Sequence, residues 1–381
     1  MKVSSILMFF ITLCSIQQMK AQRYNIKQLD RDKIISVVDT VVKWQIEAYP
    51  RMNEQRFWKS VGDLSWENGV FLAALAEWSE YIQDDTLISW YEEIADRNKW
   101  QTCPNRYSIY FADDLIVSLM YRTLYEKRKN KKIIEPTLAR LEYIVNNPSQ
   151  GSLYMGEKGY KERWSWCDAL YMAPPVFAAF ASYSVNPNLI DFMNNEFWAS
   201  YDHLFDQEEK LFYRDSNQFE KREKNGEKVF WGRGNAWVVA GLAQIIQELP
   251  DHYSPKAAYV NLFKTMMQRI TPLQDEEGFW HASLLDPDSY PVPETSSTAF
   301  FSYCLWWGIN NGILDKDEYI SHAIKGWNAI VNAVQPDGML GWVQPVGADP
   351  QQVTSNMTEV YGAGAMMKTA KQILLYLEKN N

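Results

Sequence analysis

Residues 68–78 have the sequence NGVFLAALAEW, in which a polar residue, Asn68, precedes a run of small and apolar side chains at helical spacing. A helix that is apolar nearly all round must lie inside a protein, because no face of it suits water. The same pattern recurs five times, beginning at Asp113 (DDLIVSLMYRTL), Asp168 (DALYMAPPVFAAF), Asn235 (NAWVVAGLAQII), Glu294 (ETSSTAFFSYCLWW) and Glu359 (EVYGAGAMMKTA). The sequence therefore predicts six buried helices.

A more amphipathic segment precedes each of these runs. The segments carry apolar residues at i, i+3 and i+4 with charges between them, and cover roughly 33–49, 86–97, 135–146, 188–205, 255–271 and 316–334. Amphipathic helices cover apolar ones by turning their apolar face inward. We therefore predict an all-α fold, an (α/α)6 barrel with six inner helices inside six outer helices.

The N-terminus has the composition of a leader. Residues 1–22 have a basic start, an apolar run over 6–13 and a small residue, Ala21, near their end, as a secretory signal peptide does. Export to the periplasm or outside the cell is expected, with a lipid anchor at Cys14 as the alternative. Residues 23–381 are predicted to form a single catalytic domain, and no later apolar run is long enough to span a membrane.

Charge and composition exclude several classes of partner. The formal net charge of -9 argues against nucleic acid as a partner. Three cysteines remain after the leader, Cys103, Cys167 and Cys304, and an odd, sparse set does not make a disulfide framework. The four histidines show no metal-ligand spacing, so neither a metal nor a cofactor is predicted. The sequence carries no signal for oligomeric state.

The connections into the predicted inner helices are long and aromatic, for example YMGEKGYKERWSWC (154–167) and GMLGWVQPVGADPQQVTSNMT (338–358). Helix connections in bundles usually have about two to eight residues, and longer ones are more often functional. In a closed barrel these connections emerge on one face, around the N-terminal ends of the inner helices. Trp and Tyr there suit sugar rings, and helix N-termini favour an anion.

Asp168 is the only charged side chain in 164–182, WSWCDALYMAPPVFAAFAS. Trp164 and Trp166 would shield it from water, which raises the pKa of a carboxyl group toward the range where it donates a proton near neutral pH. A structural role is the alternative, either capping a short helical turn or pairing with Arg163.

Asp113 and Asp114 open the second predicted inner helix, where a cap and a catalytic role are both expected of an aspartate. If Asp113 faces Asp168 across the cavity, one carboxyl group is held ionised and the other protonated. That arrangement suits acid and base chemistry. The residue that caps the helix remains open between the two aspartates.

The motif WGRGNAW (231–237) indicates a binding site for an anion. Arg233 carries a planar fork of donors that suits a carboxylate, and Trp231 and Trp237 flank it. In the structural alternative, Asn235 caps the helix and Arg233 pairs with an internal acid.

Three residues on other connections are weaker candidates. Lys158 and Arg214 are cations that could hold an anion, although loop cations are more often only solvated. His281 follows two aromatic residues and is a candidate for a hydrogen bond to a sugar, with packing or surface exposure as its alternative. Glu294 is expected to satisfy free backbone N–H groups where its helix begins.

Four motifs together resemble a known family: WCDALYM, WGRGNAW, SLLDPDSYPVPETSSTAF and EVYGAGA. The chain resembles the unsaturated rhamnogalacturonyl hydrolases of glycoside hydrolase family 105 and, more distantly, the unsaturated glucuronyl hydrolases of family 88. The likeness runs from about residue 30 to the C-terminus. It implies an (α/α)6 barrel that removes a 4,5-unsaturated uronic acid from the non-reducing end of oligosaccharides left by polysaccharide lyases, with unsaturated galacturonyl-rhamnose from rhamnogalacturonan as the expected substrate.

The resemblance also implies a mechanism, in which the double bond is hydrated and the anomeric carbon is not attacked. Asp168 would protonate C4 and then, as a carboxylate, activate the water that adds at C5. Asp113 matches an aspartate that assists. The hemiketal formed would open and release the remaining sugar.

The same resemblance implies substrate contacts. Arg233, Trp231 and Trp237 match positions around the unsaturated uronate, and Lys158 falls near a lysine of similar role. Arg214 departs from the pattern, because many members have a histidine there that touches the substrate. The departure leaves the reaction type intact and the identity of the next sugar open.

Two other functions remain as alternatives. A hydrolase of the tandem-aspartate mannanase type would use Asp113 and Asp114 on a neutral glycan, without need for Arg233. A sugar-binding protein without catalysis would tolerate Asp168→Asn with full binding.

Overall fold

A computed structural model describes residues 29–55, 59–104 and 107–380, so the expected leader lies outside the described residues. Within them, a ring of inner helices is formed by α3 (Trp66–Ile82), α5 (Ser118–Arg128), α8 (Pro174–Phe180), α10 (Gly232–Glu248), α12 (Thr295–Asn310) and α14 (Val360–Asn380). Each inner helix contacts the next in chain order, and α14 contacts α3, which closes the ring.

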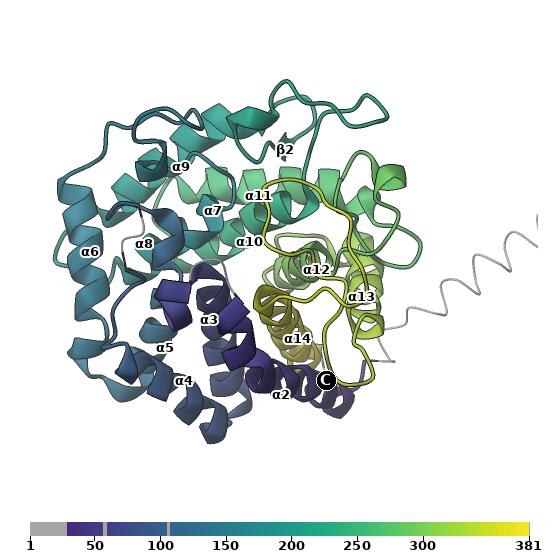
Figure 1. Cartoon of the computed structure of the whole chain (residues 1–381), viewed down its shortest axis with the longest axis horizontal. Helices are drawn as coiled ribbons and strands as arrows, with labels where there is room; N and C mark the ends of the chain where they lie inside the picture. Colours follow the sequence, from purple (N-terminus) through teal and green to yellow (C-terminus); the bar gives the residue numbers. More distant parts are fainter. Residues whose placement is uncertain (1–28, 56–58, 105–106, 381) are drawn as a thin grey trace, which may run out of the picture.

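The amphipathic segments form the outer layer, seen around the periphery in Figure 1. These helices are α2 (Arg31–Gln55), α4 (Asp85–Arg97), α6 (Glu135–Asn146), α9 (Leu189–Leu204), α11 (Lys256–Ile270) and α13 (Lys316–Asn332). Every residue from Thr295 to Ile309 of α12 is buried, whereas α13 buries a stripe that includes Tyr319, Ala323 and Ile330. The predicted (α/α)6 barrel is confirmed, and the expected outer segments lie within a few residues of the observed helices, apart from the longer C-terminal end of α2.

The third inner helix is broken, as its prolines predict. A short helix, α7 (Ala169–Met172), follows Asp168, and Pro174 and Pro175 form the first turn of α8. Helix α10 packs closely on α7 because it has no side chain at Gly241, where a Cβ atom would lie 2.3 Å from the Leu170 carbonyl oxygen. This close approach fixes Asp168 relative to α10.

The second inner helix begins later than the sequence predicts. Asp113 and Asp114 lie in a 3-10 turn, η3 (Ala112–Leu115), and α5 begins at Ser118 after Val117. Neither aspartate is the N-cap of α5, so the capping role is wrong. The reason is that Asp114 binds an arginine of the outer layer, as described below.

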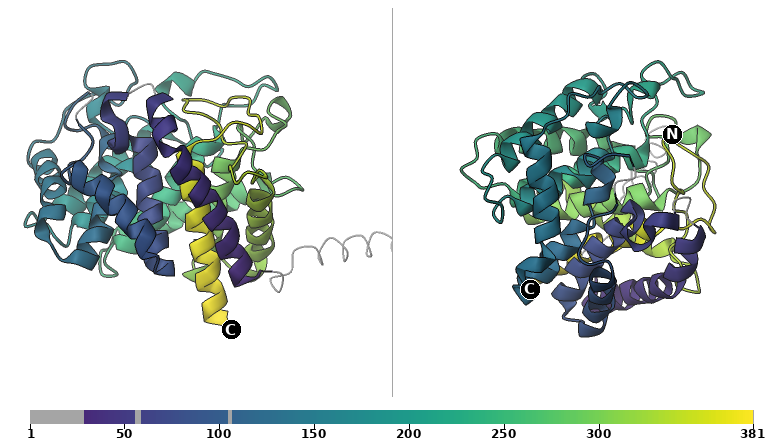
Figure 2. Two further views of the ribbon diagram at one scale, coloured as in Figure 1. Left: turned by 60° about the horizontal axis from the view of Figure 1, so that its bottom comes forward. Right: turned by 60° about the vertical axis from the view of Figure 1, so that its left-hand side comes forward.

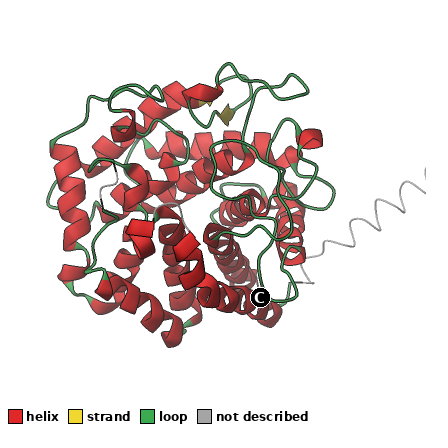
Figure 3. Cartoon of the chain, in the orientation of Figure 1, coloured by secondary structure: helices red, strands yellow, loops and turns green. Residues whose placement is uncertain are grey.

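The rest of the described chain is mainly loop, drawn green in Figure 3. It contains one antiparallel hairpin, β1 (Phe205–Asp206) with β2 (Leu211–Phe212), and the 3-10 turns η2 (Lys59–Leu64), η4 (Lys131–Ile133), η5 (Tyr160–Glu162), η6 (Ser216–Gln218), η7 (Thr271–Leu273) and η8 (Pro287–Ser289). In the left view of Figure 2 most long connections lie at the top, and α14 ends at the bottom. No helix in the described ranges is long and apolar enough to cross a membrane.

Candidate active site

A cavity of about 160 Å³ lies where the inner helices begin. Its walls combine aromatic, acidic and basic side chains from several connections: Trp66, Tyr107, Phe111, Asp113, Trp166, Asp168, Met172, Arg214, Trp231, Arg233, Val346 and Gly347. Six of the predicted site residues are therefore brought together at the expected end of the barrel, although they are far apart in the chain.

Asp168 is mostly buried, with 13% of its side chain exposed, and forms an ion pair with Arg214. The Arg214 Nε atom lies 3.3 Å from Asp168 Oδ2. The structural alternatives do not hold, because the Asp168 side chain makes no capping hydrogen bond to α7 and Arg163 pairs instead with Glu196, at 2.5 Å. Asp168 thus faces the cavity.

Burial raises the pKa of Asp168, and the nearby Arg214 and Arg233 guanidinium groups lower it. Burial outweighs the two cations, so the pKa of Asp168 lies above its usual value. The expected upward direction is confirmed. A carboxyl group in this state can give a proton and, after ionisation, is stabilised by the same cations.

Arg214 is held between two aspartates. Its Nη1 atom lies 2.5 Å from Asp215 Oδ2, and Asp215 Oδ1 accepts from the Asn217 N–H at 2.8 Å. The backbone joins the same two connections, because the Cys167 N–H donates to the Arg214 carbonyl oxygen at 2.8 Å. The relative position of Asp168 and Arg214 is therefore fixed by the backbone as well as by charge.

Arg233 is buried in the wall of the cavity, and its fork is occupied. Its Nη1 atom donates to the Gln344 carbonyl oxygen and its Nη2 atom to that of Pro345, at 2.7 Å. The guanidinium lies over the rings of Trp231 and Tyr361, 4.5 and 4.9 Å from their centroids. The sequence predicted an open fork or a partner acid, and the structure has neither. The backbone carbonyls of a distant loop take the donors instead.

That loop is fastened to α12 by Glu294. Glu294 Oε1 accepts from the Gln344 N–H at 3.0 Å, and the carboxylate also accepts from the Ser296 and Ser297 N–H groups of the first helical turn. Gln344 in turn accepts a hydrogen bond from Trp231 Nε1 at 3.0 Å. The expected cap is confirmed, and it also positions the wall that contains Arg233.

Replacing Glu294 by Gln is expected to lower the free energy of unfolding by about 1–3 kcal/mol, because an amide donor would face backbone N–H groups in a fully buried site. Asp315→Asn is the matched control, since Asp315 caps α13 on the outside of the barrel. Chemical denaturation of both variants measures the effect. Equal losses would show that the Glu294 cap has no special role.

The two neighbouring aspartates differ in environment. Asp113 is half-buried and lines the cavity. Asp114 is fully buried beside Arg140, whose Nη2 atom lies 3.3 Å from Asp114 Oδ2 and whose Nη1 atom donates to the Cys103 carbonyl oxygen. A tandem-aspartate mechanism would need Asp114 at the substrate, so this geometry disfavours the mannanase alternative.

Four predicted site residues do not line the cavity: Trp237, Asn235, His281 and Lys158. Trp237 is fully buried against Tyr171 and Phe300, with ring centroids 4.8 and 4.6 Å away. The Asn235 amide accepts from the Phe212 N–H at 2.8 Å and donates to the Phe212 carbonyl oxygen at 3.1 Å. Both residues support the wall from behind, and Asn235 is not the helix cap.

His281 and Lys158 lie elsewhere. His281 Nε2 is 3.2 Å from Asp275 Oδ2, and its Nδ1 atom is 2.9 Å from the Tyr290 carbonyl oxygen. Burial lowers the pKa of His281, but Asp275 outweighs it and the net shift is upward. Lys158 is exposed on its loop. Direct contact of either residue with a substrate is not supported by this geometry.

Some cavity residues were not singled out in the sequence, namely Trp66, Tyr107, Phe111, Met172, Val346 and Gly347. The first three lie on aromatic connections that the sequence marked as a group. Phe111 stacks on Trp166, with ring centroids 5.3 Å apart. Val346 and Gly347 had no signal, because the sequence does not tell which part of a long loop folds back over the site. Among the described residues, no cluster of three or more His, Cys, Asp or Glu could hold a metal ion.

Comparison with known proteins shows which family the chain belongs to. The model of Glycosyl Hydrolase Family 88 matches residues 37–376. The chain is 34% identical to the "Unsaturated 3S-rhamnoglycuronyl hydrolase" of Alteromonas sp. (strain LOR), over 94% of this chain and 92% of that one. It is 32% identical to a protein of the same name from Formosa agariphila, over 96% and 97% of the two chains.

A solved structure of the same family is also similar to the chain. The protein described as "Glycosyl hydrolase family 88 from Bacteroides vulgatus" is 28% identical and superposes with a TM-score of 0.80, over 91% of this chain and 100% of that one. The resemblance to the unsaturated uronyl hydrolases is confirmed, and the chain belongs to Glycosyl Hydrolase Family 88 and is a glycoside hydrolase.

Proposed function

We propose that the protein removes an unsaturated uronic acid from the non-reducing end of an oligosaccharide by hydrating its double bond. The names of two relatives, each more than 30% identical over nearly the whole chain, support an unsaturated uronyl substrate. The observation that carries the proposal is the buried Asp168, with its raised pKa, in one cavity with Asp113 and Arg214.

Asp168 is the proton donor in this proposal. Protonated, it gives its hydrogen to C4 of the unsaturated ring, and positive charge develops at C5, stabilised by the ring oxygen. The Asp168 carboxylate then removes a proton from the water that adds at C5. The resulting hemiketal opens, the former C1 acetal becomes an aldehyde and the remaining sugar leaves. Asp113, on the same cavity, assists by orienting the ring or the water.

Arg214 is the best-placed cation for the substrate carboxylate. Its Nε and Nη1 atoms face Asp168 and Asp215, and its Nη2 atom makes no hydrogen bond within the described part of the chain. Arg233 adds positive charge from the wall while its own donors stay on Gln344 and Pro345. An arginine that holds both the acid and the substrate anion would align the two.

The size of the cavity supports action at the chain end. Pockets that enclose drug-sized ligands have volumes of about 300–1,000 Å³. A cavity of about 160 Å³ encloses much less, so a terminal sugar ring fits while the rest of the oligosaccharide lies outside. The aromatic side chains of Trp166, Phe111 and Trp231 in the lining suit contact with a sugar ring.

Rhamnose is the proposed sugar beyond the cleaved bond. Both relatives are named for a rhamnoglycuronyl substrate, with the designation 3S. Fragments of rhamnogalacturonan, predicted from the sequence, and fragments that match the relatives' names share a rhamnose next to an unsaturated uronate. The two substrates differ beyond that shared unit.

A substrate panel tests the proposal. Lyase-generated fragments in which an unsaturated uronate is linked to rhamnose are compared with unsaturated fragments of glycosaminoglycans. The rhamnose-linked fragments are used with and without the 3S modification in the names of the two relatives. The ultraviolet absorbance of the conjugated double bond should fall with the rhamnose-linked fragments, together with release of the neighbouring sugar. Stable absorbance with every fragment, using folded protein, would refute the proposed reaction. Loss of absorbance only with glycosaminoglycan fragments would refute the rhamnose assignment.

Replacing Arg214 by Met is expected to move the alkaline limb of the pH–rate profile to higher pH. The Arg214 cation lowers the pKa of Asp168, so its removal raises that pKa and keeps the acid protonated at higher pH. The substrate KM should also rise, because its carboxylate loses a partner. Arg163→Met, which breaks the ion pair with Glu196 away from the cavity, is the control. An alkaline limb that stays in place or moves down would contradict this role.

Export is part of the proposal and rests on the composition of residues 1–22. Processing is expected close to Ala21. Mass spectrometry of the protein recovered from its native host tests this, and an intact N-terminus would contradict it.

A further inference from the structure

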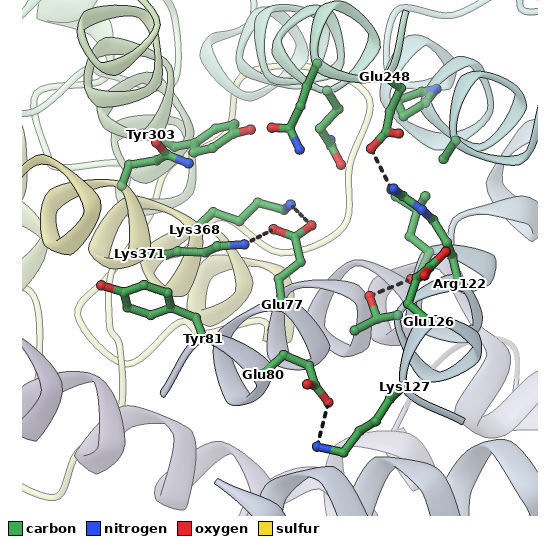
Figure 4. Close-up of a pocket in the computed structure, with 17 residues that line it drawn as sticks. Glu77, Glu80, Tyr81, Arg122, Glu126, Lys127, Glu248, Tyr303, Lys368 and Lys371 are labelled. Carbon is green, nitrogen blue, oxygen red and sulfur yellow. Dashed lines mark hydrogen bonds and ion pairs between the residues drawn. The ribbon is translucent and has the colours of Figure 1, made fainter. Parts of the chain in front are cut away.

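A second and larger cavity, of about 540 Å³, lies at the other end of the barrel (Figure 4). Its walls come from the C-terminal parts of α3 and α10, from most of the length of α5, from α8 and from the middle of α12 and α14. On α3, Glu77 lines this cavity and Trp66 lines the first one, 11 residues earlier (77 minus 66). At 1.5 Å per residue the two positions are about 16 Å apart along the helix. No described residue lines both cavities, so the two are separate.

Ion pairs form part of the wall, and of their members only Lys368 is fully buried. Lys368 Nζ lies 2.7 Å from Glu77 Oε1, and Lys371 Nζ lies 3.5 Å from Glu77 Oε2. Burial raises the pKa of Glu77, but the two lysines outweigh it and hold that pKa at about 2. On the opposite wall, Arg122 Nη1 lies 2.5 Å from Glu248 Oε1. The four cations of the lining are matched by four carboxylates, those of Glu77, Glu80, Glu126 and Glu248, so the lining has no net charge.

Other polar groups face the cavity without a partner. Tyr303 is 4% exposed, and its hydroxyl, which makes no hydrogen bond to another described residue, points toward the open centre in Figure 4. Gln244 is 8% exposed and lines the same wall. It approaches Tyr171, but its Nε2 atom completes no hydrogen bond within the described residues. Buried polar groups of this kind ordinarily have a partner, either protein, water or ligand.

We propose that this cavity is a binding site for a small uncharged saccharide. A hydroxyl group both donates and accepts, so one hydroxyl can bridge the ammonium and carboxylate of a pair such as Lys368 and Glu77. The amide of Gln244 and the hydroxyl of Tyr303 complete a set of alternating donors and acceptors. The volume falls within the usual range of small-molecule sites.

An anionic ligand fits this cavity poorly. Each lining cation has an acidic partner: Arg122 pairs with Glu248 and Lys127 with Glu80, and Lys368 and Lys371 share Glu77. The C-terminal ends of α3, α5 and α10 also direct their carbonyl groups and the negative ends of their dipoles toward this side of the barrel. The first cavity lies at the opposite, positive ends. The two sites thus differ in the charge of the sugar that each accepts.

Equilibrium binding to the whole chain tests the proposal. L-Rhamnose, D-glucose and cellobiose serve as uncharged probes and D-glucuronate as the anionic counterpart, each titrated by calorimetry or saturation-transfer NMR. At least one uncharged probe should bind saturably, and D-glucuronate should bind at least tenfold more weakly at this site. Asp168→Asn, a change confined to the first cavity, should leave the affinity of the uncharged probe unchanged. Failure of the proposed hydrolase activity would not affect this result.

Two substitutions locate the bound probe. Tyr303→Phe removes only the hydroxyl, and Gln244→Leu keeps the size of the side chain, so each should weaken binding about tenfold. Tyr81→Phe is the matched control, because Tyr81 lines the same cavity but its hydroxyl already donates to Glu378 at 2.6 Å. No saturable binding of any uncharged probe would overturn the proposal. So would binding that both variants leave intact, binding lost in Asp168→Asn, or equal affinity for D-glucuronate.

Discussion

Replacing Asp168 by Asn is expected to lower kcat by about 10²- to 10⁴-fold while substrate affinity stays near that of the native protein, since this is the range that a positioned general acid and base contributes. Asparagine has the size of aspartate but neither gives a proton to carbon nor takes one from water. The fold should survive, because Arg214 keeps its ion pair with Asp215 and the backbone link from Cys167 remains. Steady-state kinetics and direct binding of a lyase-generated disaccharide measure the two effects.

Asp206→Asn is the matched control for this variant. Asp206 is also an ion-paired carboxylate, 2.8 Å from Lys228, but it lies on the β1 hairpin away from the cavity. The control should keep nearly full turnover. If Asp168→Asn also kept nearly full turnover, Asp168 would not be the acid. The hypothesis of a sugar-binding protein without catalysis would be supported only if the native protein turned over none of the fragments.

Replacing Arg233 by Met is expected to lower both stability and turnover. The partly buried Pro345 carbonyl oxygen loses its donor, whereas the Gln344 carbonyl oxygen still accepts from the Tyr361 hydroxyl at 2.5 Å. Leaving a buried acceptor without a partner costs about 1–3 kcal/mol. The loop that forms one wall of the cavity should loosen, and the pKa of Asp168 should rise because a cation is lost. Denaturation and the pH–rate profile measure these effects.

Arg222→Met is the control for this prediction. Arg222 also donates to backbone carbonyls, those of Phe219 and Lys221, but on the exposed surface. Surface changes of this kind usually alter stability by no more than about 0.5 kcal/mol. If Arg233→Met were as stable as the native protein but had a much higher KM, Arg233 would bind the substrate directly, as the sequence predicted.

The fold was accessible from the sequence because its layers differ in periodicity. An inner helix such as α12 is apolar on every side, whereas α13 has one apolar stripe, and that contrast assigns each segment to a layer without knowledge of its neighbours. The alternation then allows few arrangements. The end of the barrel that carries the site followed from the long aromatic connections, and Asp168, Arg214 and Trp231 do meet there.

The hydrogen-bond or ion-pair partner of each polar group could not be predicted from the sequence. The Arg233 donors are taken by carbonyls more than 100 residues away, and the amide of Asn235 is bound to the backbone of Phe212 on β2. Asp113 and Asp114 are adjacent and chemically identical, yet only one faces the cavity, because Arg140 of an outer helix binds the other. These outcomes depend on long-range packing, which local pattern does not encode.

The most direct measurement uses a substrate analogue in which carbon replaces the oxygen between the unsaturated uronate and the next sugar. Such an analogue has no glycosidic bond to cleave, but its double bond is intact. If Asp168 protonates C4 and water adds at C5, the ultraviolet absorbance of the analogue should fall with the native protein and stay constant with Asp168→Asn. An analogue that binds with its absorbance unchanged, while the oxygen-linked substrate is hydrolysed, would contradict hydration and place the attack at the anomeric carbon.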